Sequence, residues 1–356
     1  MIAVDAMGGD FAPRAVVHGA YQAAKHGIPI QLFGDEAQLV LILQELDPSW
    51  STLPISLIHC TQIIAMGEEP SKSVVQKKDS SLVRAVAAVA NGQAQAVVSA
   101  GNSGAALVAG TLILERAHGI LRPAIGDFLP TKKGSVFCID LGANTDAKPE
   151  YLEQFAVMGH AYVRLMKKIN EPRIALLSNG HEPYKGSVVV KEAYKRLESS
   201  ALHFVGNLEP RDMFDDRADV IVCDGFVGNV LLKSIQGTAR AIMHWLGQEY
   251  TASWWRKLLL VLQAKLFKGL KQKIDYAQKG GALLLGLKKP LVIAHGCSQA
   301  IAIENAIRFA HRIVQEEFIP VFNAEVALLM RQRLAPQGVV ARTLGTIFKG
   351  RSTQPS

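Results

Sequence analysis

Short apolar runs, each ending in small or polar residues, recur along the chain and give the clearest structural signal. Nearly every position in these runs is hydrophobic, rather than every second one, which is typical of strands buried on both faces of a parallel sheet. The pattern predicts strands at Ile2–Val4, Ile30–Phe33, Ile55–Ile58, Ala96–Val98, Val136–Ile139, Ile174–Leu177, Val220–Cys223 and Leu291–Ala294.

Stretches with helical periodicity follow most of these runs, and they predict helices at Arg14–His26, Ser81–Asn91, Gly104–Arg116, Glu150–Lys168, Gly186–Ser199 and Val227–Leu246. Alternation of this kind indicates βαβ units and therefore an α/β fold with a doubly wound, mostly parallel sheet. We expect one large domain over residues 1–342. The tail over residues 343–356 has no acidic residue and no strong periodicity, so we expect it to fray.

Polar, glycine-containing loops follow six of the predicted strands, at residues 5–10, 99–104, 140–144, 178–182, 224–229 and 295–298. Ligands of open α/β sheets bind beyond the carboxyl ends of the strands, so the loops together predict a long polar cleft. For any single loop the alternative is an ordinary turn, because Gly, Asn, Asp and Ser are common turn residues.

The loop at residues 99–104 is the best candidate for a phosphate site. Its glycines permit close backbone approach, and the N–H groups at the start of the next helix attract anions. Ser99, Asn102 and Ser103 add side-chain donors around Gly101. The alternative is that Ser103 only caps that helix.

Three further residues are candidates for catalysis. Lys185 precedes a predicted helix, where it would reinforce an anion site or polarise a carbonyl group; alternatively, it is a solvated lysine. Asn229 could donate an amide hydrogen to a developing oxyanion, or could instead cap a helix that begins near Val230. Asp224 lies on the other side of the same Gly-Phe-Val-Gly turn and would orient it.

Familiar cofactor and metal motifs are missing from the chain. It contains neither the G-x-G-x-x-G nor the P-loop pattern, and Ala300 breaks a near match to G-x-S-x-G around Ser298. Several aspartates could suggest a divalent metal, but each can equally cap a helix: Asp5, Asp10, Asp140, Asp146 and Asp224. We predict no metal and no cofactor.

Positive charge is concentrated in one segment. The formal net charge is +8, and residues 252–273 hold six basic residues and no acidic one. Together with tryptophan and leucine, these residues favour a helical hairpin, about residues 246–276, on an anionic membrane or an acidic partner; a dimer-forming helix is the alternative. The predicted surface residues are Trp254, Trp255, Arg256, Lys257, Leu258, Leu262, Lys265 and Lys268.

The four cysteines lie far apart in the sequence, so we expect neither a zinc ribbon nor a disulfide scaffold. The first residues do not resemble a signal peptide, and no apolar run is long enough to cross a bilayer. We therefore expect a cytoplasmic protein.

Several sequence runs in this order resemble the phosphate acyltransferase family of bacterial phospholipid synthesis. They are Ile2–Pro13 (IAVDAMGGDFAP), Lys77–Leu82 (KKDSSL), Val97–Gly104 (VVSAGNSG), Leu141–Glu150 (LGANTDAKPE), Phe155–Gly159 (FAVMG), Ala218–Lys233 (ADVIVCDGFVGNVLLK), Gly280–Gly286 (GGALLLG) and Ala294–Ser298 (AHGCS). DAMGGD together with CDGFVGN is a specific combination.

The resemblance implies a fold like that of isocitrate and isopropylmalate dehydrogenases and of phosphotransacetylases. It implies acyl transfer from acyl-(acyl carrier protein) to orthophosphate, a homodimer, peripheral membrane association and coupling to a glycerol-3-phosphate acyltransferase, with no cofactor and no nucleic acid. Besides the phosphate loop, the residues expected to bind phosphate or substrate are Asp5, Gly8, Gly9, Asp10, Asn144, His295 and Ser298.

One departure from the family pattern is His181, which stands where the family has an acidic residue, while Gly180, Glu182, Lys185 and Gly186 match. Three other functions compete with the one implied. They are a phosphotransacetylase-like enzyme that uses acyl-coenzyme A, a metal- and nicotinamide-dependent dehydrogenase suggested by fold analogy, and a non-enzymatic scaffold on a lipid surface.

Overall fold

The computed structural model describes residues 1–251 and 280–333. The described chain divides into two compact units. Unit 1 comprises residues 1–117, 123–127, 229–251 and 280–320, and unit 2 comprises residues 118–122, 128–228 and 321–333. Both units are assembled from segments that are separated in the sequence, and the single domain expected over residues 1–342 stays a prediction.

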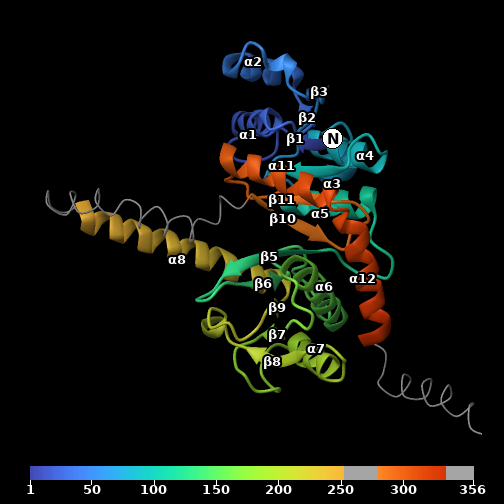
Figure 1. The fold of residues 1–356 in the computed structure, drawn as a ribbon, viewed down its shortest axis with the longest axis vertical. Coiled ribbons are helices and arrows are strands. Elements are labelled where there is room, and N and C mark those ends of the chain that lie inside the picture. The colour runs from blue at the N-terminus through green and yellow to red at the C-terminus, as the bar shows by residue number, and fades with distance from the viewer. Residues whose placement is uncertain (252–279, 334–356) are drawn as a thin grey trace, which may run out of the picture. The chain divides into compact units, whose positions relative to one another are not determined.

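Unit 1 contains a sheet in which the strands follow the order β3-β2-β1-β4-β11-β10-β5 (Figure 1). Neighbours from β3 to β11 pair in parallel, whereas β10 pairs antiparallel with both β11 and β5. The strands are β1 (Ile2–Asp5), β2 (Ile30–Gly34), β3 (Ile55–His59), β4 (Ala96–Ser99), β5 (Ala124–Pro130, of which residues up to Asp127 belong to unit 1), β10 (Gly281–Leu285) and β11 (Leu291–Ala294).

The helices of unit 1 pack through small residues. Gly19 of α1 faces α11, and a Cβ atom at this position would lie 2.5 Å from the carbonyl oxygen of Ala300. Close packing of α1 on α11 therefore depends on glycine here. The helices are α1 (Arg14–Lys25), α2 (Glu36–Leu46), α3 (Pro70–Gln76), α4 (Ser81–Ala90), α5 (Ser103–Ala109) and α11 (Ala300–Gln315), with short helical turns at Trp50–Thr52 and Gly110–Leu114.

Unit 2 contains parallel strands in the order β6-β9-β7-β8, namely β6 (Ser135–Ile139), β9 (Val220–Val222), β7 (Ile174–Leu177) and β8 (Phe204–Leu208). Helices α6 (Pro149–Lys167) and α7 (Val188–Glu198) pack together, and a short turn spans Pro210–Asp212. In the core, the rings of Phe137 and Tyr162 stack with centroids 4.5 Å apart.

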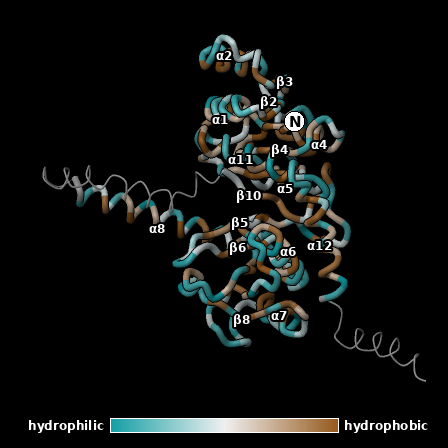
Figure 2. The backbone as a smooth tube through the Cα atoms, in the orientation of Figure 1, coloured by the Kyte–Doolittle hydropathy of each residue, from teal (hydrophilic) through white to brown (hydrophobic). Residues whose placement is uncertain are grey.

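Two helices contribute residues to both units, α8 (Gly225–Thr251) and α12 (Phe318–Arg333). Along α8, hydrophobic and hydrophilic residues alternate (Figure 2), and apolar side chains such as Val230 and Trp245 are exposed. In the described part of the chain, no helix is long and apolar enough to cross a membrane.

The predicted α/β class with a mostly parallel sheet is confirmed, and every predicted strand is present. Three strands were not predicted: β5, β8 and β10. The part of the expected hairpin beyond residue 251 and the expected frayed tail lie outside the described residues. Of the four cysteines, all free, only Cys297 is exposed.

Candidate active site

Three of the polar loops meet within unit 1, at the ends of β1, β4 and β11. The Asp10 amide donates to the Gly296 carbonyl at 2.8 Å, which joins the first loop to the last. A Cβ atom at Gly8 would lie 2.8 Å from the Gly101 nitrogen, and Gly9 has a φ of 117°, which favours glycine. The predicted substrate loop at residues 5–10 is therefore in contact with the other two, at residues 99–104 and 295–298.

Asp5, at the end of β1, is 2% exposed and is held by two hydroxyl groups. Ser81 and Ser99 donate to its two carboxylate oxygens at 2.6 and 2.7 Å, and Ser99 in turn accepts the Gly101 amide at 3.1 Å. Burial raises the pKa of Asp5, and the two hydroxyl donors oppose that rise. Ser81 was missed as a site residue, although the KKDSSL run that contains it was recognised.

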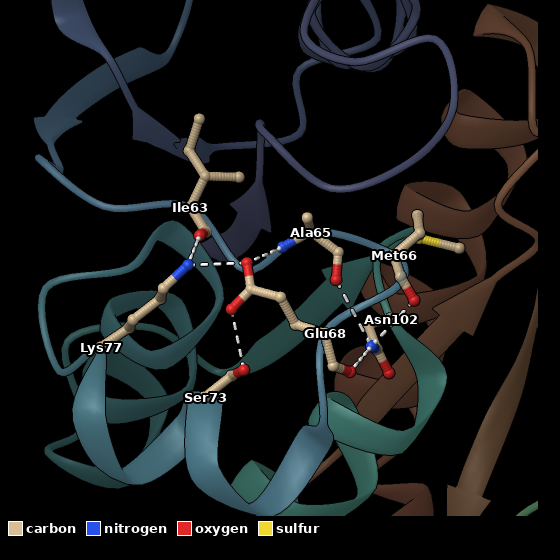
Figure 3. A network of polar contacts seen from close by, with 7 residues as sticks. All are labelled: Ile63, Ala65, Met66, Glu68, Ser73, Lys77 and Asn102. Carbon is tan, nitrogen blue, oxygen red and sulfur yellow. Dashed lines mark hydrogen bonds and ion pairs between the residues drawn. The ribbon is translucent and has the colours of Figure 1, made fainter.

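Asn102 caps helix α5. Its side-chain nitrogen donates hydrogen bonds to backbone carbonyl groups of a neighbouring segment (Figure 3). Its Oδ1 accepts the Ala105 amide at 3.0 Å, and its Nδ2 donates to the carbonyl oxygens of Met66 and Glu68 at 3.1 and 3.0 Å. The cap is thus Asn102 rather than Ser103, which is exposed at the first helical position. That Ser99, Asn102 and Ser103 bind phosphate stays a prediction, with Ser103 the most accessible of them.

The loop after β11 supplies two polar groups, a half-buried His295 and a buried Ser298. Burial, with a smaller contribution from the positive charge of Lys233, lowers the pKa of His295, so its neutral form is favoured. Ser298 is 3% exposed, and its hydroxyl has no hydrogen-bond partner in the described part of the chain. The Ser298 backbone amide donates to the His295 backbone carbonyl oxygen at 2.9 Å, which closes the turn.

Unit 2 brings two other loops together around Asp140, which is fully buried at the end of β6. The Asp140 carboxylate accepts the Asn144 amide at 2.7 Å and the Asn144 side chain at 2.8 Å. The Asn144 carbonyl then accepts the Gly225 amide at 2.7 Å. A Cβ atom at Gly228 would overlap the Asp140 carbonyl oxygen, so the loops at residues 140–144 and 224–229 interlock.

Asp224 caps α8, since its Oδ1 accepts the Val227 amide at 2.8 Å. The helix begins at Gly225, earlier than expected, so Asn229 lies inside the first turns and is exposed there rather than acting as the cap. Asp224, and not Asn229, therefore caps the helix. That Asn229 donates a hydrogen bond to an oxyanion stays a prediction.

Lys185 follows β7 in a loop that is held at both ends. Gly186 donates its amide to Asn179 Oδ1 at 2.9 Å, and Ser187 caps α7 through the Val190 amide. The Lys185 ammonium lies 5.7 Å from the centre of the Tyr184 ring. This arrangement leaves Lys185 only partly buried.

His181, which replaces the family's acidic residue, anchors the same loop. Its Nε2 forms an ion pair with Asp212 at 2.9 Å when protonated, and its Nδ1 lies 3.4 Å from the Asn207 carbonyl oxygen. An acidic side chain at this position would face Asp212 and Glu209. A histidine suits the acidic surroundings of this chain better than the family's carboxylate.

The comparisons with known proteins show the family of the chain. A family model described as a fatty acid synthesis protein matches residues 1–320. The phosphate acyltransferase of Geobacillus thermodenitrificans is 45% identical over 91% of this chain and 98% of its own length. The chain belongs to the phosphate acyltransferase family. The phosphate acyltransferase of Geobacter sulfurreducens is also 45% identical, over 88% of this chain and 91% of its own length.

Membership of this family makes the chain an acyltransferase. Among solved structures, a phosphotransacetylase from Streptococcus pyogenes matches with a TM-score of 0.57 and 18% identity, covering 88% of this chain and 94% of that one. The EutD phosphotransacetylase from Staphylococcus aureus matches with a TM-score of 0.52 and 16% identity, covering 88% and 93%. At these identities the likeness confirms the predicted phosphotransacetylase-like fold.

The predicted residues thus form two groups, one in each unit, and Asn229 lies on α8. That both groups line one cleft stays a prediction. The predicted surface residues from Trp254 to Lys268 lie outside the described residues.

Proposed function

We propose that this acyltransferase transfers a fatty acyl group from acyl-(acyl carrier protein) to orthophosphate, and that the acyl phosphate serves phospholipid synthesis through a glycerol-3-phosphate acyltransferase. The observation that supports this most is the 45% identity, over nearly the whole chain, to proteins named phosphate acyltransferase. The glycine-containing loops of unit 1 add a surface suited to a small anion.

The reaction needs little covalent help from the protein. A phosphate oxygen attacks the thioester carbonyl carbon, the carbon–sulfur bond breaks, and the carrier leaves as a thiol after its sulfur gains a proton. Phosphate is nucleophilic near neutral pH and a thiolate is a good leaving group. The protein must therefore supply an anion site, a donor for the oxyanion and alignment of the reactants.

We assign the phosphate to the loop around Gly101, with the exposed Ser103 as a donor and Ser99 and Asn102 holding the loop. Lys185 holds phosphate or assists the proton transfer. Asn229 donates to the oxyanion from the helix that Asp224 caps.

Substitution of these residues tests the assignment. We expect Asn229→Ala to lower kcat by about 10²–10³-fold, as loss of one oxyanion donor does. Lys185→Ala should also lower turnover. Near wild-type turnover of both variants, with circular dichroism spectra that match the wild type, would contradict these roles.

We assign the basic segment at residues 252–273 both to binding of the membrane surface and to docking of the acidic carrier protein. We expect the protein to act as a cytoplasmic homodimer that binds membranes peripherally. Replacing Trp255, Leu258 and Leu262 by polar residues should release the protein from anionic vesicles in a sedimentation assay. Unchanged vesicle binding would eliminate the membrane role.

The deciding experiment incubates the purified protein with palmitoyl-(acyl carrier protein) and orthophosphate, without metal or nicotinamide, and traps acyl phosphate with hydroxylamine. Phosphate-dependent hydroxamate supports the proposal, and no product from folded protein rejects it. A parallel reaction with palmitoyl-coenzyme A separates the carrier-protein donor from the phosphotransacetylase-like alternative.

A further inference from the structure

The KKDSSL run, Lys77–Leu82, has no assigned part in the reaction, yet its first residue holds a neighbouring segment in place. The Lys77 ammonium donates to the Ile63 carbonyl at 2.8 Å and to Glu68 Oε1 at 2.6 Å (Figure 3). Glu68 also accepts the Ala65 amide at 2.9 Å and the Ser73 hydroxyl at 2.8 Å. Backbone groups of the segment at residues 63–68 therefore form hydrogen bonds with both members of one ion pair, Lys77 and Glu68.

That segment in turn holds the loop assigned to phosphate. The carbonyl oxygens of Met66 and Glu68 accept hydrogen bonds from the Asn102 side-chain nitrogen, and the Asn102 side-chain oxygen caps α5. On the same side, a Cβ atom at Gly104 would lie 2.6 Å from Pro70 Cγ, so the start of α3 packs directly on the loop. A continuous chain of contacts thus runs from Lys77 through Glu68 to Asn102.

The ion pair between Lys77 and Glu68 stays charged over a wide pH range. The hydrogen bond from Lys77 is the largest of the causes that lower the pKa of Glu68 to about 2, so its carboxylate stays ionised at neutral and mildly acidic pH. The Lys77 and Glu68 side chains are 33% and 29% exposed, which makes this pair less screened by solvent than most surface pairs.

We propose that Lys77 is a positioning residue for phosphate. Its ammonium holds residues 63–68 against Asn102 and so fixes the loop at residues 101–104; the role rests on the proposed function of that loop. Without the ammonium, Asn102 loses fixed carbonyl partners and α5 loses a well-placed cap. Phosphate affinity then falls. Binding of the acyl donor is expected to be unchanged, because the proposed function assigns phosphate, and not the donor, to this loop.

Other residues of the run are anchored independently of the Lys77 ammonium. Asp79 accepts the Thr61 amide and hydroxyl at 2.9 and 2.6 Å, and Ser81 donates to Asp5 at 2.6 Å. Neither contact involves Lys77, so the variants below remove the ion pair and leave these anchors in place.

The test compares Lys77→Met with a matched control on α3. Lys77→Met should raise the KM for orthophosphate about tenfold, the effect of losing a charged hydrogen bond, and leave the KM for palmitoyl-(acyl carrier protein) unchanged. Lys77→Arg should recover most of the phosphate KM. The control Lys72→Met removes the same charge from a side chain that is 76% exposed and that, among the described residues, forms an ion pair with Glu69 alone. Its KM values should match the wild type.

A second variant, Glu68→Gln, keeps the side-chain shape and should reproduce the effect of Lys77→Met. Titration with inorganic phosphate, followed by phosphorus NMR, measures the dissociation constant without turnover. A wild type that binds phosphate but forms no hydroxamate would reject the proposed function and still allow this comparison.

Two results would overturn the positioning role. One is an unchanged phosphate KM and dissociation constant in folded Lys77→Met and Glu68→Gln. The other is an equal rise in both KM values that follows a fall in Tm and is not reversed in Lys77→Arg, which would make the ion pair merely structural.

Discussion

Asp5 and Asp140 are nearly or fully buried, and both lie where a strand ends. Asp5 is held by the hydroxyl groups of Ser81 and Ser99, whereas Asp140 binds the backbone and side-chain amides of its own turn. Both carboxylates therefore fix the loops that follow them. Neither needs to be a metal ligand to account for its burial, since buried carboxylates require hydrogen-bond donors in any case.

The pH dependence of stability provides a test at His295. Because its pKa is lowered in the folded protein, the unfolded chain binds more protons at this residue just below pH 6.5. Its contribution to stability is therefore complete above that pH and is lost as the pH falls. We expect the free energy of unfolding, from urea denaturation, to fall more steeply between pH 7 and pH 5 in the wild type than in His295→Gln. Parallel pH profiles would contradict the lowered pKa.

At the residue scale, the sequence predicted which polar loops follow the strands but not how their side chains pair. Position after a buried strand is a local property, so Asp5, Asn102 and Asp224 could be identified. The bond from Ser81 to Asp5 joins residues far apart in the sequence, and only the folded sheet brings them together.

Among the elements, most parallel strands were predictable, whereas the parallel strand β8 and the antiparallel pair β5 and β10 were not. Strands β1, β4 and β11 are continuous apolar runs, as expected for central strands. Strand β8 has exposed and half-exposed positions, β5 contains glycine and aspartate, and β10 begins with glycine. Their pattern is too weak locally, and their pairing depends on strands that are distant in sequence.

Helix packing in unit 1 provides a second test. In Gly19→Ala the added methyl group must displace the backbone of α11, so we expect the free energy of unfolding to fall by about 1–3 kcal/mol. The control Gly237→Ala adds the same group to α8, where no atom of the described residues lies within 4 Å of the added Cβ atom, apart from the backbone of the helix itself. It should raise helix stability by up to about 1 kcal/mol. Chemical denaturation measures both, and equal effects would contradict the close packing of α1 on α11.

At the scale of the whole molecule, the α/β class and the family could be recognised from the sequence, because local pattern and short motifs carry both. The division into two units could not, because each unit is assembled from separated segments and two helices contribute to both. The distribution of charge was also readable from the sequence, since six of the basic residues that produce the net charge of +8 lie within residues 252–273.

This charge distribution predicts salt-sensitive encounter with an acidic carrier protein. Lys265→Gln combined with Lys268→Gln should lower kcat/KM for acyl-(acyl carrier protein) at low salt and flatten its dependence on sodium chloride. The control, Lys191→Gln with Lys195→Gln, removes two charges from exposed positions of α7 and should keep the wild-type salt dependence. If both double variants behave alike, net charge rather than its location governs the encounter.

The place of β11 beside β4 has a consequence for synthesis on the ribosome. Strand β4 ends at Ser99, but its partner β11 begins only at Leu291. At about 5–20 residues per second, some 10–40 seconds separate the emergence of the two strands. All four strands β6 to β9 emerge within that interval, so unit 2 can complete its parallel strands first. Until β11 is synthesised, the edge of β4 that pairs with it stays unpaired in the nascent chain. We expect the nascent chain to be prone to aggregation during this interval, and a chaperone that covers this strand edge to reduce that aggregation.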